Sequence, residues 1–250
     1  MKGSPVFKWV SIGTVLLGAL AASAGAAADE DRWVTLRQRL VREIGADVRA
    51  ASRRFGGKDL AQVALDAMAR VPRHEFVPSE QHPYAYENRP LPIGYGQTIS
   101  QPYIVAIMTA LAEAEAGKTA LEVGTGSGYQ AAVLAACGVD VHSMEIIPEL
   151  GKQAGERLKR LGYDGVEVRA GDGYYGWPDR APFDIILVTA ASSQVPPPLI
   201  AQLKPGGKMV IPVGGPFMVQ HLMLVEKADD GRVTSRELLP VAFVPLTGGH

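Results

Sequence analysis

Three glycines at positions 124, 126 and 128 follow an apolar run and precede an alanine-rich segment. Glycine has no Cβ, so it can adopt positive φ and let backbone N–H groups approach a ligand at a helix N-terminus. The spacing is GxGxG, whereas dinucleotide sites favour GxGxxG with the pyrophosphate on the helix dipole. The tighter spacing favours a nucleoside cofactor without phosphates, S-adenosylmethionine (SAM). A purely structural strand-to-helix turn is the alternative.

Two acidic residues stand where such a cofactor needs acceptors. Glu145 ends the next predicted strand, where a carboxylate can hold ribose hydroxyls. Asp172 follows a third strand and is predicted to accept a hydrogen bond from the adenine amino group, although a glycine-flanked aspartate is also typical of a plain turn. We therefore expect these residues to contact the cofactor: Gly124, Thr125, Gly126, Ser127, Gly128, Glu145, Asp172 and Gly173.

Helical and extended periods alternate from residue 101 onwards. The predicted strands are 120–123, 139–145, 166–170, 183–189, 209–213, 221–226 and about 241–246. The predicted helices are 102–115, 129–137, 148–161 and about 198–203, with Ser100 as a candidate N-cap of the first and a turn at 204–207 before a strand. Such alternation requires a parallel sheet with right-handed crossovers, and the last strands suggest an antiparallel edge. This is the doubly wound, seven-stranded, mostly parallel α/β outline of a class I SAM-dependent methyltransferase.

The residues ahead of this sheet are predicted to form a helical cap. Apolar side chains at steps of three and four indicate amphipathic helices over 33–54 and after Asp59, a candidate N-cap. Residues 71–99 are rich in proline and glycine and predict a long functional loop. We expect 29–100 (helices and substrate loop) and 101–250 (SAM-binding domain) to form one compact unit.

The first 28 residues resemble a secretory signal peptide. Lys2 and Lys8 precede an uncharged run with an apolar centre, which ends in alanine, glycine and serine. This order is typical of a leader cleaved near residues 24–28. The run is long enough to leave a retained N-terminal anchor as the alternative. In either case we expect an exported, periplasmic domain.

Composition and charge narrow the partners. The chain of 250 residues is 47% hydrophobic and 20% charged, which fits one large globular α/β domain. Its formal net charge of −1 shows no basic surplus, so we expect no nucleic-acid partner. The histidines lack metal-ligand spacing, so we expect no metal. We also expect a monomer.

Four segments together resemble one family. They are PLPIGYGQTISQP at 90–102, LEVGTGSGYQ at 121–130, APFDIILVTAA at 181–191 and KPGGKMVIPVG at 204–214. In order and spacing they are similar to protein-L-isoaspartate (D-aspartate) O-methyltransferases of the bacterial type, over about residues 73–247. The first segment is the most specific, because other class I methyltransferases share the glycine turn but not this loop.

The resemblance implies methyl transfer from SAM to the free carboxylate of L-isoaspartyl, and also D-aspartyl, residues in damaged proteins. The ester then cyclises to a succinimide, and hydrolysis returns some normal aspartate. Ser100 matches the family's active-site serine, and Thr98, Ile99 and Thr247 are implied substrate contacts. Tyr95, 189–194 and 244–247 are expected walls of the peptide groove. The alternatives are a methyltransferase of a small carboxylate metabolite and a noncatalytic SAM-binding protein. Relatives in this family are commonly cytoplasmic.

Overall fold

A computed structural model describes residues 13–55, 60–215 and 218–249, with side chains from residue 29 onwards. The helices are α1 Gly13–Phe55, α2 Ala61–Arg70, α3 Pro102–Leu111, α4 Tyr129–Ala136, α5 Pro148–Arg160 and α6 Pro197–Gln202. The strands are β1 Leu91–Gly94, β2 Gln97–Ile99, β3 Thr119–Val123, β4 Asp140–Glu145, β5 Glu167–Ala170, β6 Phe183–Val188, β7 Leu203–Val213, β8 Gln220–Lys227 and β9 Val233–Val241. Four short 3₁₀ helices join them, at Arg73–Phe76, Ser79–Tyr84, Gly173–Tyr175 and Pro178–Arg180.

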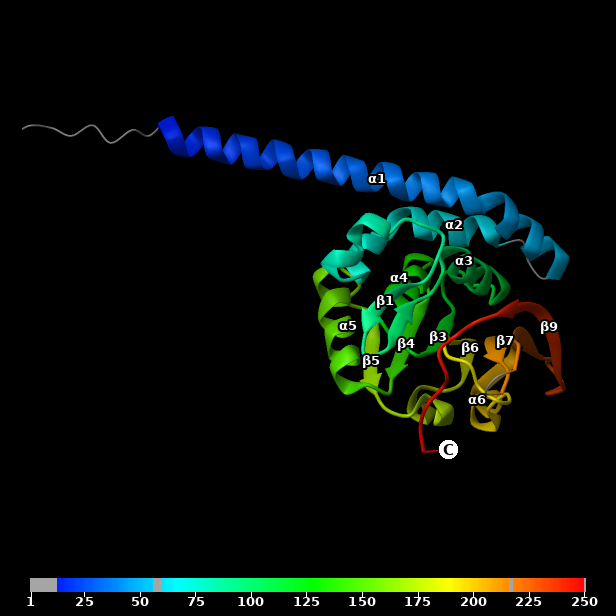
Figure 1. The fold of residues 1–250 in the computed structure, drawn as a ribbon. Helices are drawn as coiled ribbons and strands as arrows, with labels where there is room; N and C mark the ends of the chain where they lie inside the picture. Colours follow the sequence, from blue (N-terminus) through cyan, green and yellow to red (C-terminus); the bar gives the residue numbers. More distant parts are fainter. Residues whose placement is uncertain (1–12, 56–59, 216–217, 250) are drawn as a thin grey trace, which may run out of the picture.

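The main sheet has seven strands in the order β5-β4-β3-β6-β7-β8-β9. The five strands from β5 to β7 pair in parallel, and β8 and β9 add antiparallel at one edge. Within this sheet the chain first forms β3 in the middle, then β4 and β5 outward on one side, and then returns to form β6 on the other side of β3 (Figure 1). This confirms the predicted class I methyltransferase fold. The point where the order reverses, between β3 and β6, is where open α/β sheets bind ligands.

Alternate residues of the central strands face two separate cores. Ile185 and Leu187 of β6 pack into the larger core, whereas Ile186 and Val188 pack into the smaller one. The larger core contains side chains from α1 to α5, and the smaller core contains Leu199 of α6. Because side chains alternate along a strand, a strand buried on both faces needs the continuous apolar sequence seen here.

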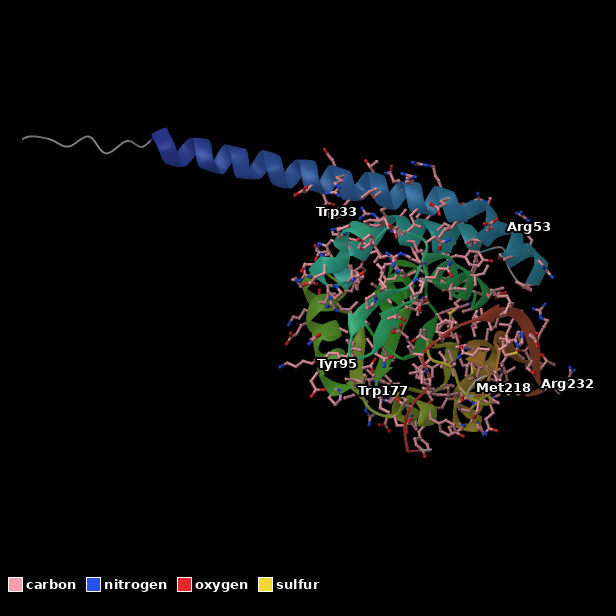
Figure 2. All side chains as sticks on the ribbon, in the orientation of Figure 1. Trp33, Arg53, Tyr95, Trp177, Met218 and Arg232 are labelled. Atoms are coloured by element: carbon pink, nitrogen blue, oxygen red, sulfur yellow. The ribbon has the colours of Figure 1, made fainter. Side chains whose placement is uncertain are left out.

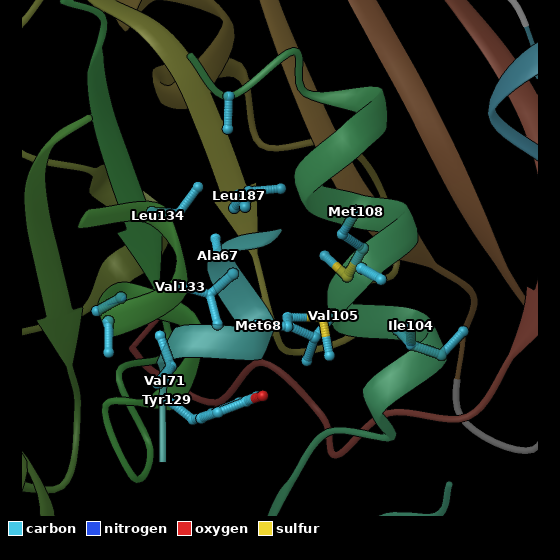
Figure 3. Close-up of a cluster of buried hydrophobic side chains, with 14 of the residues drawn as sticks. Ala67, Met68, Val71, Ile104, Val105, Met108, Tyr129, Val133, Leu134 and Leu187 are labelled. Carbon is cyan, nitrogen blue, oxygen red and sulfur yellow. The ribbon is translucent and has the colours of Figure 1, made fainter. Parts of the chain in front are cut away.

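The larger core joins the N-terminal cap to the sheet. Figure 3 shows Met68 of α2, Met108 of α3, Val133 of α4 and Leu187 of β6 converging on one cluster. All four side chains are almost fully buried. Residues on both sides of position 100 therefore share one hydrophobic core.

The structure corrects several predicted boundaries. Helix α3 ends at Leu111 rather than at residue 115, because Glu113 adopts a positive φ of 54°. The N-cap of α3 is Gln101, so the prediction that Ser100 caps it is wrong. The loop over 71–99 contains the short hairpin β1–β2, in addition to two 3₁₀ helices.

The edge of the sheet also differs from the prediction. The last strand is β9, Val233–Val241, rather than residues 241–246. Most of its side chains are exposed, so the apolar pattern used to find buried strands does not mark it. The turn predicted at 204–207 lies within β7, where the pairing with β6 is irregular. The segment after β9 makes an isolated bridge between Ala191 and Pro245.

Helix α1 is longer than the predicted 33–54, and its first half extends away from the rest of the molecule (Figure 1). The helix passes through the predicted cleavage region at residues 24–28 without a break. Residues 1–12 of the predicted leader, and the proposed N-cap Asp59, lie outside the described residues. In the part of the chain that the structure describes, no helix is both long and apolar enough to cross a membrane.

An aromatic cluster attaches α1 to the cap. Trp33 of α1, labelled in Figure 2, stacks on His74 with ring centroids 4.6 Å apart. His74 is buried, and its Nδ1 lies 2.8 Å from the Tyr86 hydroxyl. Burial lowers the pKa of His74. The negative charge of Glu75 partly opposes this shift, and the nearby His82 adds a small further decrease. The neutral imidazole is therefore the form that the folded protein prefers.

Acidification is expected to weaken this attachment. Because the pKa of His74 is lower in the folded protein than the usual 6.5, the unfolded chain takes up the proton first as the pH falls below about 6.5. The stability is thus complete above that pH and declines below it. We expect the thermal midpoint of His74→Asn to fall less than that of wild type between pH 7.5 and 5.5. Equal decreases would show that His74 does not contribute to the acid sensitivity.

Candidate functional site

The glycine turn lies between the carboxyl end of β3 and the start of α4. Gly124, Gly126 and Gly128 have φ values of 96°, 54° and 88°, which L side chains rarely adopt. A Cβ on Gly124 would collide with the Thr189 hydroxyl, and one on Gly128 would lie 3.2 Å from the Leu158 side chain of α5. The glycines therefore serve both the turn and its close packing.

Glu145 fixes the conformation of this turn. It ends β4, is 5% exposed, and accepts a hydrogen bond from the Gly126 N–H at 2.8 Å through Oε2. Its Oε1 accepts from the Ile147 N–H at 3.0 Å. A carboxylate offers about four lone pairs, so Glu145 keeps acceptor capacity for ligand hydroxyls.

A cavity at the switch point collects several of the predicted cofactor contacts. It is lined by residues of the glycine turn, the ends of β4 and β6, and the C-terminal segment: Gln97, Thr98, Val123, Gly124, Gly126, Met144, Glu145, Ile146, Gly173, Thr189, Ala190, Val244, Pro245, Leu246 and Thr247. We call it the inner cavity. Gly173 is required here because a Cβ would collide with Val123. The lining places four of the eight predicted residues directly on one hollow: Gly124, Gly126, Glu145 and Gly173.

The other four predicted cofactor residues lie around this cavity rather than on it. Thr125 and Ser127, the residues between the three glycines, have buried side chains that line a small neighbouring cavity. Gly128 packs against α5. Asp172 stands next to Gly173 and caps the following 3₁₀ helix by accepting from the Tyr174 N–H at 3.0 Å. Both interpretations of Asp172, turn residue and ligand contact, are compatible with this position.

The C-terminal segment reaches the same aspartate. The Gly249 N–H donates to Asp172 Oδ2 at 3.0 Å. We predict that this N–H competes with the adenine amino group for the carboxylate. Gly249→Pro, which removes the donor, should tighten SAM binding by roughly two- to fivefold, the scale of an exposed hydrogen bond to a charged group. Calorimetric titration of wild type, Gly249→Pro and Gly249→Ala tests this, and identical affinities would rule the competition out.

A buried carboxyl group that was not among the predicted site residues lies under the turn. Glu122 of β3 is fully buried, and burial raises its pKa to about 8. Its Oε2 accepts a hydrogen bond from Ser143 Oγ, which lies 2.6 Å from Thr125 Oγ1. The acidic residue in an otherwise apolar strand was a signal that could have revealed it. At neutral pH this group is mostly uncharged and links β3, β4 and the turn.

A second hollow, the outer groove, lies next to the inner cavity. It has a volume of about 450 Å³ and is lined by Pro90, Thr98, Ser100, Gln101, Ile104, Thr189, Pro240, Val241, Ala242, Phe243 and Val244. Thr98, Thr189 and Val244 line both hollows. The Ser100 hydroxyl makes no hydrogen bond to another described residue. It remains available to a ligand in the groove.

Several predicted substrate contacts do not line the outer groove. Ile99 is buried and lines only the small cavity beneath the turn. Thr247 lines the inner cavity rather than the outer groove. Tyr95, expected as a groove wall, lines neither hollow: it is 51% exposed at the tip of the β1–β2 hairpin, where its φ is 53° (Figure 2). Residues 240–243, at the end of β9 and directly after it, line the outer groove but were not predicted as walls, because the last strand was expected at about 241–246.

The sequence of this chain is similar to those of known methyltransferases. The family model for protein-L-isoaspartate(D-aspartate) O-methyltransferase matches residues 54–250. The chain belongs to this family. A protein-L-isoaspartate O-methyltransferase of Syntrophobacter fumaroxidans is 61% identical over 236 residues, covering 94% of this chain and 96% of the relative. One from Cupriavidus necator is 57% identical over 232 residues, covering 93% and 90%.

Solved structures of isoaspartate methyltransferases have the same architecture. One protein-L-isoaspartate O-methyltransferase is 29% identical with a TM-score of 0.73, and the match covers 85% of this chain and 66% of that chain. A protein from Plasmodium falciparum, titled as a putative member and solved with S-adenosyl-L-homocysteine, has a TM-score of 0.69 at 24% identity, covering 84% and 98%. The second match supports the fold alone. Within the described residues, no cluster of three or more His, Cys, Asp or Glu is placed to hold a metal ion.

Proposed function

We propose that this chain methylates the free carboxylate of isoaspartyl residues in damaged proteins, with SAM as the methyl donor, and thereby initiates their repair. One observation carries the proposal: Thr98 and Thr189 line both the inner cavity and the outer groove. A cofactor in the first and a peptide in the second would therefore meet at these two residues. Membership of the isoaspartate methyltransferase family supports the same pairing.

The residues of the inner cavity fit SAM. Closely packed glycines line it, and Glu145 keeps acceptor capacity for ribose hydroxyls. We assign cofactor contacts to Gly124, Gly126, Glu145 and Gly173, with Asp172 at the adenine end. We propose that Thr125, Ser127 and Gly128 stabilise the turn through their buried contacts instead of touching the cofactor. When bound, SAM supplies an electrophilic sulfonium methyl group.

The outer groove has to bind and align the acceptor. A carboxylate has a reference pKa near 4, so it is ionised at neutral pH and needs no strong general base. Alignment and removal of water can contribute roughly 7–11 kcal/mol when the geometry is good. We propose that the Ser100 hydroxyl donates a hydrogen bond to one carboxylate oxygen, leaving the other to attack. Thr98 is the second polar side chain at this point.

A direct assay tests the proposal. Residues 29–250 are incubated with labelled SAM and an isoaspartyl peptide, or with the same peptide containing normal aspartate. We expect label only on the isoaspartyl peptide, with a D-aspartyl peptide as a further substrate to examine. Equal labelling of both peptides, or of neither, would overturn the assignment. A small carboxylate that is methylated when both peptides fail would instead favour the metabolite methyltransferase.

The expected location follows from the leader. Lys2, Lys8 and the apolar run after them support export. We propose a periplasmic repair enzyme that acts as a monomer. Cell fractionation followed by N-terminal sequencing tests the location, with a new N-terminus near residues 24–28 expected. An intact N-terminus in the cytoplasmic fraction would contradict it.

A further inference from the structure

A second groove is a neighbour of the outer groove. It has a volume of about 510 Å³, within the range of ~300–1,000 Å³ typical of ligand sites, and lies between α1, Asn88, the start of α3 and β9. We call it the α1 groove. Gln101 lines both this groove and the outer groove, one residue after Ser100. The two grooves also contain the consecutive residues Leu239 and Pro240, so a peptide bound at Ser100 would reach the α1 groove by passing Gln101.

One stripe of α1 forms a wall of this groove. Asp47, Ala50 and Arg54 all line it, at helical spacings of three and four. Seven residues of helix place Asp47 and Arg54 about 10 Å apart along the axis. This stripe lies near the end of α1 where Figure 2 labels Arg53. The matched family region begins at residue 54, so Asp47 and Ala50 stand ahead of it.

The groove combines an apolar floor with an unpaired carboxylate. Ala50 and Leu239 supply apolar surface, and Tyr103 supplies an aromatic ring. Asp47 is exposed and has no hydrogen bond or ion pair with another described residue. Burial, and to a smaller extent the charge of Asp47, raise the pKa of Tyr103, which indicates that the two groups lie near each other.

The positive charge that lines the groove lies about two helical turns from Asp47. The Arg54 guanidinium carbon lies 5.5 Å from the centre of the Phe55 ring, within the range of a cation–π contact. The Asp47 end of the groove therefore carries the negative charge. A lysine or arginine suits it, because its aliphatic stem can cover the apolar floor while its charged end stays near solvent.

We propose that the α1 groove is a substrate subsite that takes a residue flanking the isoaspartyl residue, and that Asp47 makes it prefer a basic side chain. This inference rests on the proposed function. It assigns α1 a role in substrate selection in addition to its packing on the cap. The α1 groove binds residues beside the damaged one, whereas Ser100 binds the damaged carboxylate itself.

The first test blocks the groove. Ala50→Trp fills it, and Ala46→Trp places the same ring on an exposed position that does not line the groove. Each variant is assayed with an isoaspartyl tripeptide and with longer peptides carrying lysine on either side. For Ala50→Trp we expect KM for the long peptides to rise about tenfold, equivalent to ~1.4 kcal/mol, with KM for the tripeptide and kcat unchanged. Ala46→Trp should match wild type on both.

The second test reverses the charge. At one flanking position, wild type should favour lysine over glutamate by roughly two- to fivefold in KM, as expected for an exposed ion pair. Asp47→Asn should remove this preference and Asp47→Lys should reverse it, while SAM affinity stays constant. The preference should also shrink at high salt, because exposed charges are screened.

The outcomes separate the two proposals. If wild type methylates neither peptide, the proposed function fails. If it methylates both, but Ala50→Trp leaves the long-peptide KM unchanged or raises the tripeptide KM equally, the subsite is wrong. Unchanged lysine preference in Asp47→Lys would remove the role of Asp47 in selectivity.

Discussion

Replacing Ser100 with alanine is expected to lower kcat by about 100-fold, the scale of a lost donor or a misaligned reactant in an active site. Ser100 lines the outer groove together with Thr98, and its hydroxyl makes no hydrogen bond to another described residue. The N-cap of α3 is Gln101, so loss of the hydroxyl should not destabilise the helix. SAM affinity should remain unchanged, because Ser100 does not line the inner cavity.

Steady-state kinetics with an isoaspartyl peptide, together with calorimetric titration of SAM, measure both quantities. Ser235→Ala on the exposed face of β9 is the matched control and should keep wild-type kcat. Thermal unfolding of all three proteins checks that the fold is intact. If Ser100→Ala turns over as fast as wild type, the serine has no part in the methyl transfer.

Gly126→Val is expected to abolish SAM binding, with Kd weakened by about 100-fold or more. Gly126 lines the inner cavity, its φ is 54°, and its N–H donates to Glu145 Oε2. A β-branched residue at this φ is strained by roughly 1–2 kcal/mol, so the turn should rearrange and release Glu145. A built Cβ lies 3.5 Å from Ile93, which leaves little room for the two methyl groups of valine.

The control has to share the backbone strain without touching the cavity. Gly162 also has a positive φ, of 81°, and a Cβ there would meet nothing within 4 Å. Gly162→Val should therefore lose stability but retain SAM affinity. Calorimetric titration at a temperature where both variants are folded makes the comparison. Full SAM affinity in Gly126→Val would mean that the turn does not form the cofactor site.

Elements with strong local signals were predictable from the sequence. The strands β3 and β6 are mostly apolar, each with a single acidic residue, and the glycines after β3 mark a turn that few other residues can form. Glu145 was predicted because the acid after the second strand of a doubly wound sheet has a defined place. Its position on the inner cavity agrees with that expectation, and its contact with SAM stays a prediction.

Features that depend on contacts between distant parts of the chain were not predictable from the sequence. β9 is an exposed edge strand held by pairing with β8, so it lacks an apolar pattern. Gln101 rather than Ser100 caps α3 because the backbone conformation at that point, and not the residue type, decides the cap. Tyr95 lies away from the groove because the hairpin β1–β2 carries it to an exposed tip.

The sequence by itself determined the fold class, the cofactor turn and the family, because each depends on residue types at short spacings. Only the tertiary structure showed that Thr98 and Thr189, 91 positions apart in the sequence, line both hollows. Only the tertiary structure brought Asp47 of α1 to a groove that shares Gln101 with the groove containing Ser100. Such arrangements depend on how distant segments pack, and packing depends on the whole set of buried surfaces rather than on a local pattern.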